Sequence, residues 1–109
     1  MLEAILGSLS SERVLLFILA RKEGYATEIA KFYKTDLAPI QRQLDKFEAA
    51  GVLASRKAGR TRLYSFNPQC PFLKELKALL EKTMTFCSDS LKEELLKNRR
   101  RPRRRGKPL

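Results

Sequence analysis

The chain has 109 residues, of which 43% are hydrophobic, enough to build the core of one small domain. Its net charge of +11 predicts a polyanionic partner, and seven of these charges fall in residues 99–109, which leaves only four on the remainder. No apolar run reaches the roughly 18 residues of a membrane span, and the N-terminus lacks a signal-peptide cleavage pattern, so we expect a cytoplasmic protein with no membrane partner.

The residue content gives little support to catalysis or metal binding. The chain has no histidine, and Cys70 and Cys87 lie far apart in the sequence without any Cys/His cluster, whereas a zinc site needs about four ligands. The five glycines are scattered and form no phosphate-binding loop. We therefore expect two free thiols, no cofactor and no enzymatic activity; an interchain redox disulfide is the alternative for the cysteines.

Two helices are predicted at the start of the chain. Met1–Leu6 is a short apolar segment that ends at Gly7, and Ser8 is suited to cap a following helix. That helix contains the uninterrupted apolar run 14–20, too short to span a bilayer and apolar on several sides. We expect a second subunit to cover part of it. The alternative is that the other helices of one chain wrap it completely.

Residues 26–50 carry the pattern of two helices joined by a tight turn. Ala26–Lys34 reads as a short amphipathic helix in which the small Ala30 permits a close helix crossing. After the turn, Asp36 is suited to cap a second helix, 36–50, whose apolar positions recur at i, i+4 and i+7. Small residues followed by Gln and Arg on its outer face suit insertion into a DNA major groove, where Gln pairs with adenine and Arg with guanine. The candidate DNA-contacting residues there are Ala38, Pro39, Gln41, Arg42 and Gln43.

A two-stranded hairpin is predicted directly after the second helix. Gly51 is placed to end that helix in a left-handed conformation. Val52–Lys57 and Thr61–Phe66 are strand-like, and Ala58-Gly59-Arg60 forms the turn between them. A helix-turn-helix followed by a hairpin with a basic tip is a winged helix. We expect the wing cations Arg56, Lys57, Arg60 and Arg62 to contact phosphates or the minor groove.

With these features the sequence resembles bacterial and archaeal winged-helix regulators of the ArsR type. The resemblance covers roughly residues 1–86 and is carried by Glu28-Ile-Ala30, Gln41-Arg-Gln-Leu44, Ala50-Gly-Val-Leu53, Gly59-Arg60, Tyr64 and Asn67-Pro68. It implies a twofold dimer formed by the first and last helices of the domain. Two departures concern the turn: Lys34 stands in place of the usual glycine, which is strained if its φ is positive, and Thr35 follows where an apolar residue is usual, so the construction of the turn stays open. The Cys/His cluster of the metal-sensing members is absent.

The C-terminal part of the domain supports the expectation of a dimer. A helix from Phe72 to Phe86 has a wide apolar face, and a further helical stretch runs from Ser88 or Ser90 to Asn98. We assign residues 1–96 to a mostly α-helical winged-helix domain with a small β-hairpin (α+β) and terminal dimerisation helices. The predicted interface residues are Leu2, Ile5, Leu15, Leu16, Leu19, Leu73, Leu76, Leu80 and Met84.

Residues 97–109 form a basic tail whose one apolar residue lies at its end, so we expect no folded structure there. Arg105-Gly106-Lys107-Pro108 resembles the Arg-Gly-Arg-Pro core of AT-hooks, which implies that an extended arm lies in a narrow minor groove. The cations assigned to DNA in the tail are Arg103, Arg104, Arg105 and Lys107. The plainer interpretation is non-specific attraction to nucleic acid.

Together these features predict a homodimeric transcriptional regulator that binds double-stranded DNA sequence-specifically. One alternative is a winged helix that serves as a protein-interaction module, such as one partner of a toxin–antitoxin or enzyme–adaptor pair. The other is RNA binding driven by the Arg-rich tail. The sequence identifies no pocket for a small-molecule effector.

Overall fold

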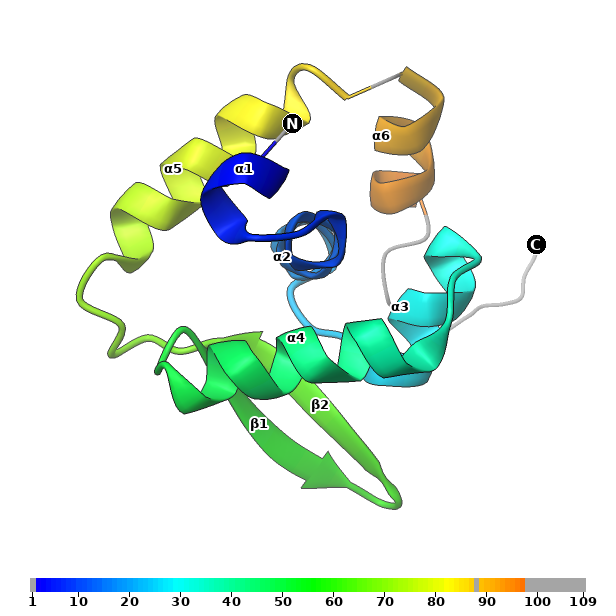
Figure 1. The fold of residues 1–109 in the computed structure, drawn as a ribbon, viewed down its shortest axis with the longest axis vertical. Coiled ribbons are helices and arrows are strands. Elements are labelled where there is room, and N and C mark those ends of the chain that lie inside the picture. The colour runs from blue at the N-terminus through cyan, green and yellow to red at the C-terminus, as the bar shows by residue number, and fades with distance from the viewer. Residues whose placement is uncertain (1, 88, 98–109) are drawn as a thin grey trace.

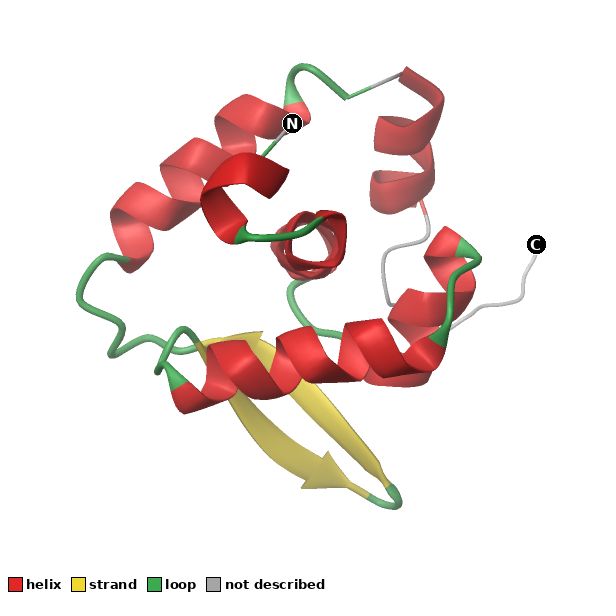
Figure 2. Ribbon diagram, viewed as in Figure 1, coloured by secondary structure: helices red, strands yellow, loops and turns green. Residues whose placement is uncertain are grey.

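The computed structural model describes residues 2–87 and 89–97 of the chain. In this part six helices and one antiparallel hairpin follow the predicted order, with most ends within two residues of their predicted positions (Figure 2). The elements are α1 (Glu3–Leu6), α2 (Leu9–Arg21), α3 (Ala26–Tyr33), α4 (Leu37–Ala49), β1 (Leu53–Ala58), β2 (Thr61–Phe66), α5 (Leu73–Met84) and α6 (Asp89–Lys97). None of the described helices is both long and apolar enough to cross a membrane.

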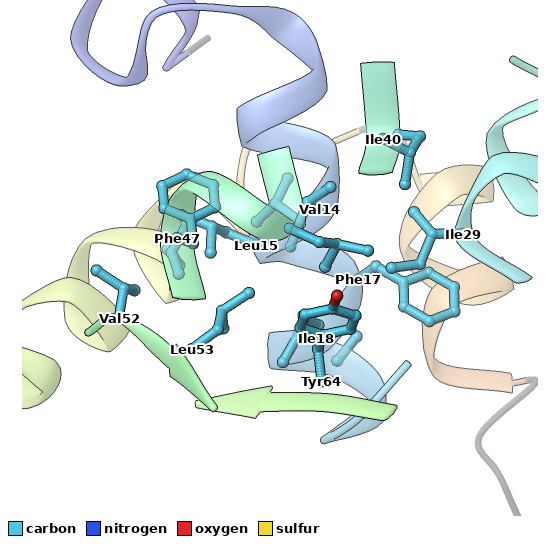
Figure 3. Close-up of a cluster of buried hydrophobic side chains, with 14 of the residues drawn as sticks. Val14, Leu15, Phe17, Ile18, Ile29, Ile40, Phe47, Val52, Leu53 and Tyr64 are labelled. Carbon is cyan, nitrogen blue, oxygen red and sulfur yellow. The ribbon is translucent and has the colours of Figure 1, made fainter. Parts of the chain in front are cut away.

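Helix α2 lies at the centre of the molecule and is surrounded by the other elements (Figure 1). All five other helices and β2 pack against it. Its apolar run is almost completely buried, and it forms one cluster with Ile29, Ile40, Leu53 and Tyr64 from the surrounding elements (Figure 3). Burial of this run is the main source of the domain's stability, since each fully buried large apolar side chain contributes about 1.5–3 kcal/mol.

This arrangement corrects the expectation that a second subunit covers α2. The chain covers α2 by itself, because α5 and α6 lie over the faces that α3, α4 and the hairpin leave open. Four residues assigned from the sequence to the dimer interface are core residues with at most 5% of their surface exposed: Leu2, Leu15, Leu16 and Leu80. Leu15 and Leu80, which have no exposed surface, cannot contact a partner subunit in this arrangement.

The helix ends follow the predicted signals, with one exception. The Ser8 hydroxyl accepts a hydrogen bond from the Ser11 backbone N–H at 3.1 Å, as a capping residue does. Asp36 occupies the cap position of α4, but its side chain makes no capping hydrogen bond. The third helical position, whose N–H such a carboxylate often accepts, is Pro39, which has no N–H.

The turn between α3 and α4, whose construction the sequence left open, is built on Lys34. Its φ of 56° and ψ of 49° are left-handed. The Lys34 N–H donates to the Lys31 carbonyl at 3.2 Å and the Thr35 N–H to the Ala30 carbonyl at 3.0 Å, so two carbonyls at the end of α3 are satisfied. This tight turn fixes α4 across α3.

The hairpin has a two-residue loop, Gly59-Arg60, with Ala58 paired to Thr61. Gly59 has a φ of 67°, which favours glycine. Ala58 is therefore strand rather than turn, and β1 begins one residue later than predicted. A further pairing was not predicted: Gly24 and Tyr64 exchange backbone hydrogen bonds of 2.8 and 3.0 Å. A Cβ on Gly24 would lie 2.8 Å from Cε1 of the buried Phe17 ring, so this approach requires glycine.

Candidate nucleic-acid interface

Helix α4 has one side buried in the core and the opposite side exposed. Ile40 and Leu44 have no exposed surface and hold the helix on the core. Ala38 and Arg42 are exposed on the opposite side, within the first half of the helix. A helix with a short side chain and an arginine on its open face has the shape and the donor groups that a DNA major groove accepts.

The neighbouring Gln41 is held within the molecule. Its Nε2 donates to Asp45 Oδ1 at 3.0 Å and to the Tyr64 hydroxyl at 3.3 Å, and that hydroxyl lies 3.4 Å from the same Asp45 oxygen. Burial raises the pKa of Tyr64, with the Asp45 carboxylate adding to the shift, so the phenol stays protonated and can donate. These contacts fix the wing relative to α4. Gln41 has to give them up before its amide can read a base.

Gln43 does not belong to the outer face. Its Oε1 accepts a hydrogen bond of 2.6 Å from the Ser11 hydroxyl on α2. Three residues after Ile40 and four before Phe47, it lies on the inward stripe of the helix. Pro39 is half-buried in the first turn. Of the five helix residues predicted to contact DNA, Ala38 and Arg42 are therefore the exposed ones.

The four wing cations predicted from the sequence, Arg56, Lys57, Arg60 and Arg62, are all exposed. Arg56 Nη2 pairs with Glu23 Oε1 at 3.0 Å, and Arg62 Nη1 donates to Ser55 Oγ at 2.9 Å. An exposed ion pair of this kind is worth about 0–1 kcal/mol, so a phosphate can replace it at little cost.

One part of the surface was missed by the sequence analysis. A cavity of about 400 Å³ lies between the start of α3, the outer face of α4 and the wing. Its lining includes Tyr25 and Thr27 at the N-terminal end of α3, together with Arg60 and Arg62. Free backbone N–H groups at a helix N-terminus and two guanidinium groups favour an anion. The sequence signal for this site was the predicted start of the helix at Ala26, because a helix N-terminus favours an anion.

The remaining candidate residues divide by exposure. Ile5 on α1 is 72% exposed. Leu19 on α2 and three residues of α5, Leu73, Leu76 and Met84, are half-buried. The large apolar residues that are exposed but were not assigned to the interface from the sequence are Leu9, Leu37, Phe72, Leu79, Phe86 and Leu96. The tail residues Arg103, Arg104, Arg105 and Lys107 lie outside the described residues.

The two cysteines are free thiols, with Cys70 buried and Cys87 half-buried. Burial raises the pKa of the Cys87 thiol, and the negative charge of Glu12 adds to the shift. A raised pKa lowers the thiolate fraction and with it the reactivity towards oxidants. Among the described residues no group of three or more His, Cys, Asp or Glu side chains is placed to hold a metal ion.

No protein-family model matches the chain, and no curated protein matches it in sequence. Its structure is similar to that of reduced HlyU from Vibrio cholerae, with a TM-score of 0.60 and 18% identity over 80% of this chain and 86% of that one. A double mutant of ZitR from Lactococcus lactis in its apo form matches with a TM-score of 0.54 and 24% identity, over 82% and 76%. The transcriptional regulator BldR from Sulfolobus solfataricus matches with a TM-score of 0.57 and 15% identity, over 89% and 67%.

The chain has a winged-helix fold. At identities below 25% these likenesses concern the fold, and they confirm the architecture that the sequence resemblance implied. Within this fold α3 and α4 are the helix-turn-helix, β1 and β2 are the wing, and Gly24 supplies a single strand-like pairing beside β2.

Proposed function

We propose that this winged-helix protein is a transcriptional regulator that binds double-stranded DNA as a homodimer. The observation that carries the proposal is the exposed face of α4, with Arg42 outermost, flanked by a wing whose four cations are all exposed. The proposal is supported by the structural likeness to the transcriptional regulator BldR.

In the proposed complex the first half of α4 enters the major groove. Ala38 allows the helix to approach the bases closely, and Arg42 reads a guanine through its N7 and O6 acceptors. Lys57 and Arg60 near the wing tip contact the backbone or the minor groove. A phosphate occupies the cavity between the start of α3 and the wing, where Thr27, Arg60 and Arg62 meet. The phosphate contacts position the protein, whereas Arg42 supplies sequence preference.

The dimer in this proposal forms through apolar residues that the chain leaves exposed. Ile5 on α1 and Leu79 on α5 are 72% and 38% exposed, and Phe72 just before α5 is 50% exposed. Both helices lie on the side of α2 opposite α4 and the hairpin (Figure 1). An interface there would leave both DNA-binding faces open, and covering these side chains removes apolar surface from water.

The test compares two arginine variants on two kinds of DNA. Genomic fragments captured by the purified protein give a preferred site, and affinities are then measured on that site and on random DNA. Arg42→Ala should weaken binding to the preferred site by about 1–3 kcal/mol and relax its base preference. Arg60→Ala should weaken binding to both DNAs by similar factors and reduce the salt dependence by about one unit.

Lys74→Ala, which removes an exposed cation from α5, on the side of α2 opposite α4 and the hairpin, serves as the control and should change neither quantity. Equal losses from Arg42→Ala on both DNAs would contradict base reading by α4. Absence of enriched fragments together with weak binding to all DNA would favour a protein-interaction module instead.

A further inference from the structure

A groove lined by apolar and basic side chains runs between the C-terminal half of α2, β2, α5 and α6. It consists of two adjoining cavities of about 300 and 370 Å³, which share Leu19, Lys22 and Glu81 in their walls. Each falls within or near the 300–1,000 Å³ of typical small-molecule sites. The groove is separate from the proposed DNA-binding face of α4, since no residue of α4 lines it.

The apolar part of the groove is formed by side chains that the core does not fully cover. Leu19 and Met84 are half-buried, and Leu96 on α6 is 43% exposed. Together they form an apolar wall contributed by α2, α5 and α6. An apolar group placed against this wall would remove its exposed surface from water, at a gain of roughly 25 cal/mol per Å².

The polar part of the groove is mainly basic. Lys22 lies in the wall that the two cavities share. Lys77 on α5 lines the cavity next to β2, and Lys92 on α6 lines the other cavity. The Lys77 amine lies 5.6 Å from the centre of the Phe66 ring, which places it over the floor of the first cavity. Glu81 is the one acidic side chain that lines the groove. In the second cavity two amines, Lys22 and Lys92, face one carboxylate, Glu81, and this excess of a single positive charge favours a singly charged anion.

We propose that this groove binds a small amphipathic monocarboxylate. Its carboxylate lies between Lys22 and Lys92, and its alkyl or aryl part lies against Leu19, Met84 and Leu96, which line the same cavity. The apolar wall excludes a fully polar anion such as inorganic phosphate as the preferred ligand, because it would leave the wall exposed. The lysines favour an anion over an uncharged hydrocarbon, because only an anion accepts a charge-assisted hydrogen bond from them.

The position of Lys22 also connects the groove to the wing. The next residue, Glu23, pairs with Arg56 of β1, and Gly24 pairs with Tyr64 of β2. A ligand that holds Lys22 therefore acts on the short segment to which the wing is attached. This consequence, an effector that changes DNA affinity, rests on the proposed function, whereas carboxylate binding does not.

The experiment titrates the full-length protein with octanoate in an isothermal titration calorimeter, with acetate and octanol as comparison ligands. Octanoate should bind saturably, and acetate and octanol should bind at least tenfold more weakly, since each lacks one half of the recognised structure. Lys22→Gly should weaken octanoate binding about tenfold, the loss expected for one charge-assisted hydrogen bond. Lys92→Gln should have a similar effect.

The matched control for Lys22→Gly is Lys34→Gly. Both lysines end a helix with a positive φ, 76° and 56°, so glycine relieves the same backbone strain in each variant and neither should fail to fold. Lys34 does not line the groove, and its variant should bind octanoate like the natural protein. Lys31→Gln is the corresponding control for Lys92→Gln.

Absence of saturable octanoate binding at millimolar concentration would overturn the proposal. Equal losses from Lys22→Gly and Lys34→Gly would also overturn it, because only one of these amines lines the groove. DNA affinity measured with and without octanoate separates the two proposals. Failure of all DNA binding would contradict the proposed function and leave the carboxylate site standing on its own titration.

Discussion

Two tyrosine hydroxyls in this domain lie in opposite hydrogen-bonding environments. The Tyr33 hydroxyl is buried and has no hydrogen-bond partner in the described part of the chain, whereas the Tyr64 hydroxyl bonds to Gln41 and Asp45. Burial raises the pKa of Tyr33 far above its ordinary value, so the hydroxyl stays protonated and its O–H remains without a hydrogen-bond acceptor. A buried hydroxyl without a partner costs about 1–3 kcal/mol of folding free energy.

Substitution by phenylalanine should therefore act with opposite sign at the two positions. Tyr33→Phe should raise the free energy of unfolding by about 1 kcal/mol, because it removes an unsatisfied group and keeps the ring. Tyr64→Phe should lower it by about 1 kcal/mol, because Gln41 and Asp45 lose a partner. Urea denaturation of both variants measures the difference. Destabilisation by Tyr33→Phe would mean that its hydroxyl has a partner in solution.

A buried arginine fastens α6 to the rest of the domain. Arg21, at the end of α2, donates from Nε to the Leu95 carbonyl and from Nη2 to the Glu94 carbonyl, both at 3.1 Å. Its guanidinium lies 4.6 Å from the Phe17 ring centre and 4.8 Å from that of Phe32 on α3. Carbonyls in the last turn of a helix lack intrahelical hydrogen-bond donors, and the helix dipole favours a positive charge there. The Arg21 guanidinium supplies both the donors and the charge.

Arg21→Met should detach α6 more than it disturbs the core. We expect the free energy of unfolding to fall by about 2 kcal/mol and the amides of residues 89–97 to exchange with deuterium faster than those of α2. The control is Arg13→Met, since Arg13 lies 5.2 Å from the Tyr33 ring and should lose only the ~0.5–1 kcal/mol of a cation–π contact. Unchanged exchange in 89–97 would show that other contacts hold α6.

The elements that sequence patterns predicted well are those set by neighbours along the chain. The Ser8 cap and the left-handed Gly51 after α4 both depend on residues within a few positions of each other. The failures involve distant partners. Gln43 is held by Ser11, 32 residues away, and Arg21 by carbonyls 73 and 74 residues away. The pairing of Gly24 with Tyr64 has no local signature either, so periodicity could not predict it.

The burial of the residues assigned to the dimer face could not be predicted from the sequence for a related reason. An apolar side chain on a helix covers either its own core or a partner, and the sequence does not distinguish the two. Leu80 and Leu79 are adjacent on α5, yet Leu80 is fully buried and Leu79 is 38% exposed. Which of them is available to a partner depends on how far α5 is rotated against α2.

This distinction gives a test of the proposed dimer. Ile5→Glu should shift the protein from dimer to monomer while its free energy of unfolding as a monomer stays within about 0.5 kcal/mol, because Ile5 is exposed. Leu80→Glu should instead unfold the domain, because it buries an unpaired charge at a fully buried position. Analytical ultracentrifugation and circular dichroism separate the two effects. A natural protein that is monomeric at micromolar concentration would contradict the dimer.

The last prediction concerns residues 99–109, which hold seven of the chain's cations. The described chain ends with α6, and Arg21 ties the last turn of α6 to Phe32 of α3, the first helix of the helix-turn-helix. The last described helix therefore lies beside the helix-turn-helix. If about half of the tail cations in a dimer neutralise phosphates, log K against log salt should steepen by roughly six units.

Truncation after Asn98 should accordingly cost much affinity at low salt and little at high salt, while the ranking of preferred sites stays nearly the same. The resemblance of Arg105-Gly106-Lys107-Pro108 to an AT-hook adds a sharper expectation. A·T-rich flanks should bind better than G·C-rich flanks only while the tail is present, because a narrow minor groove attracts arginine. Titration of full-length and truncated protein against both flank types at two salt concentrations measures both effects. A salt slope unchanged by truncation would remove the tail from DNA binding, and a steeper slope without flank preference would leave it as a non-specific polycation.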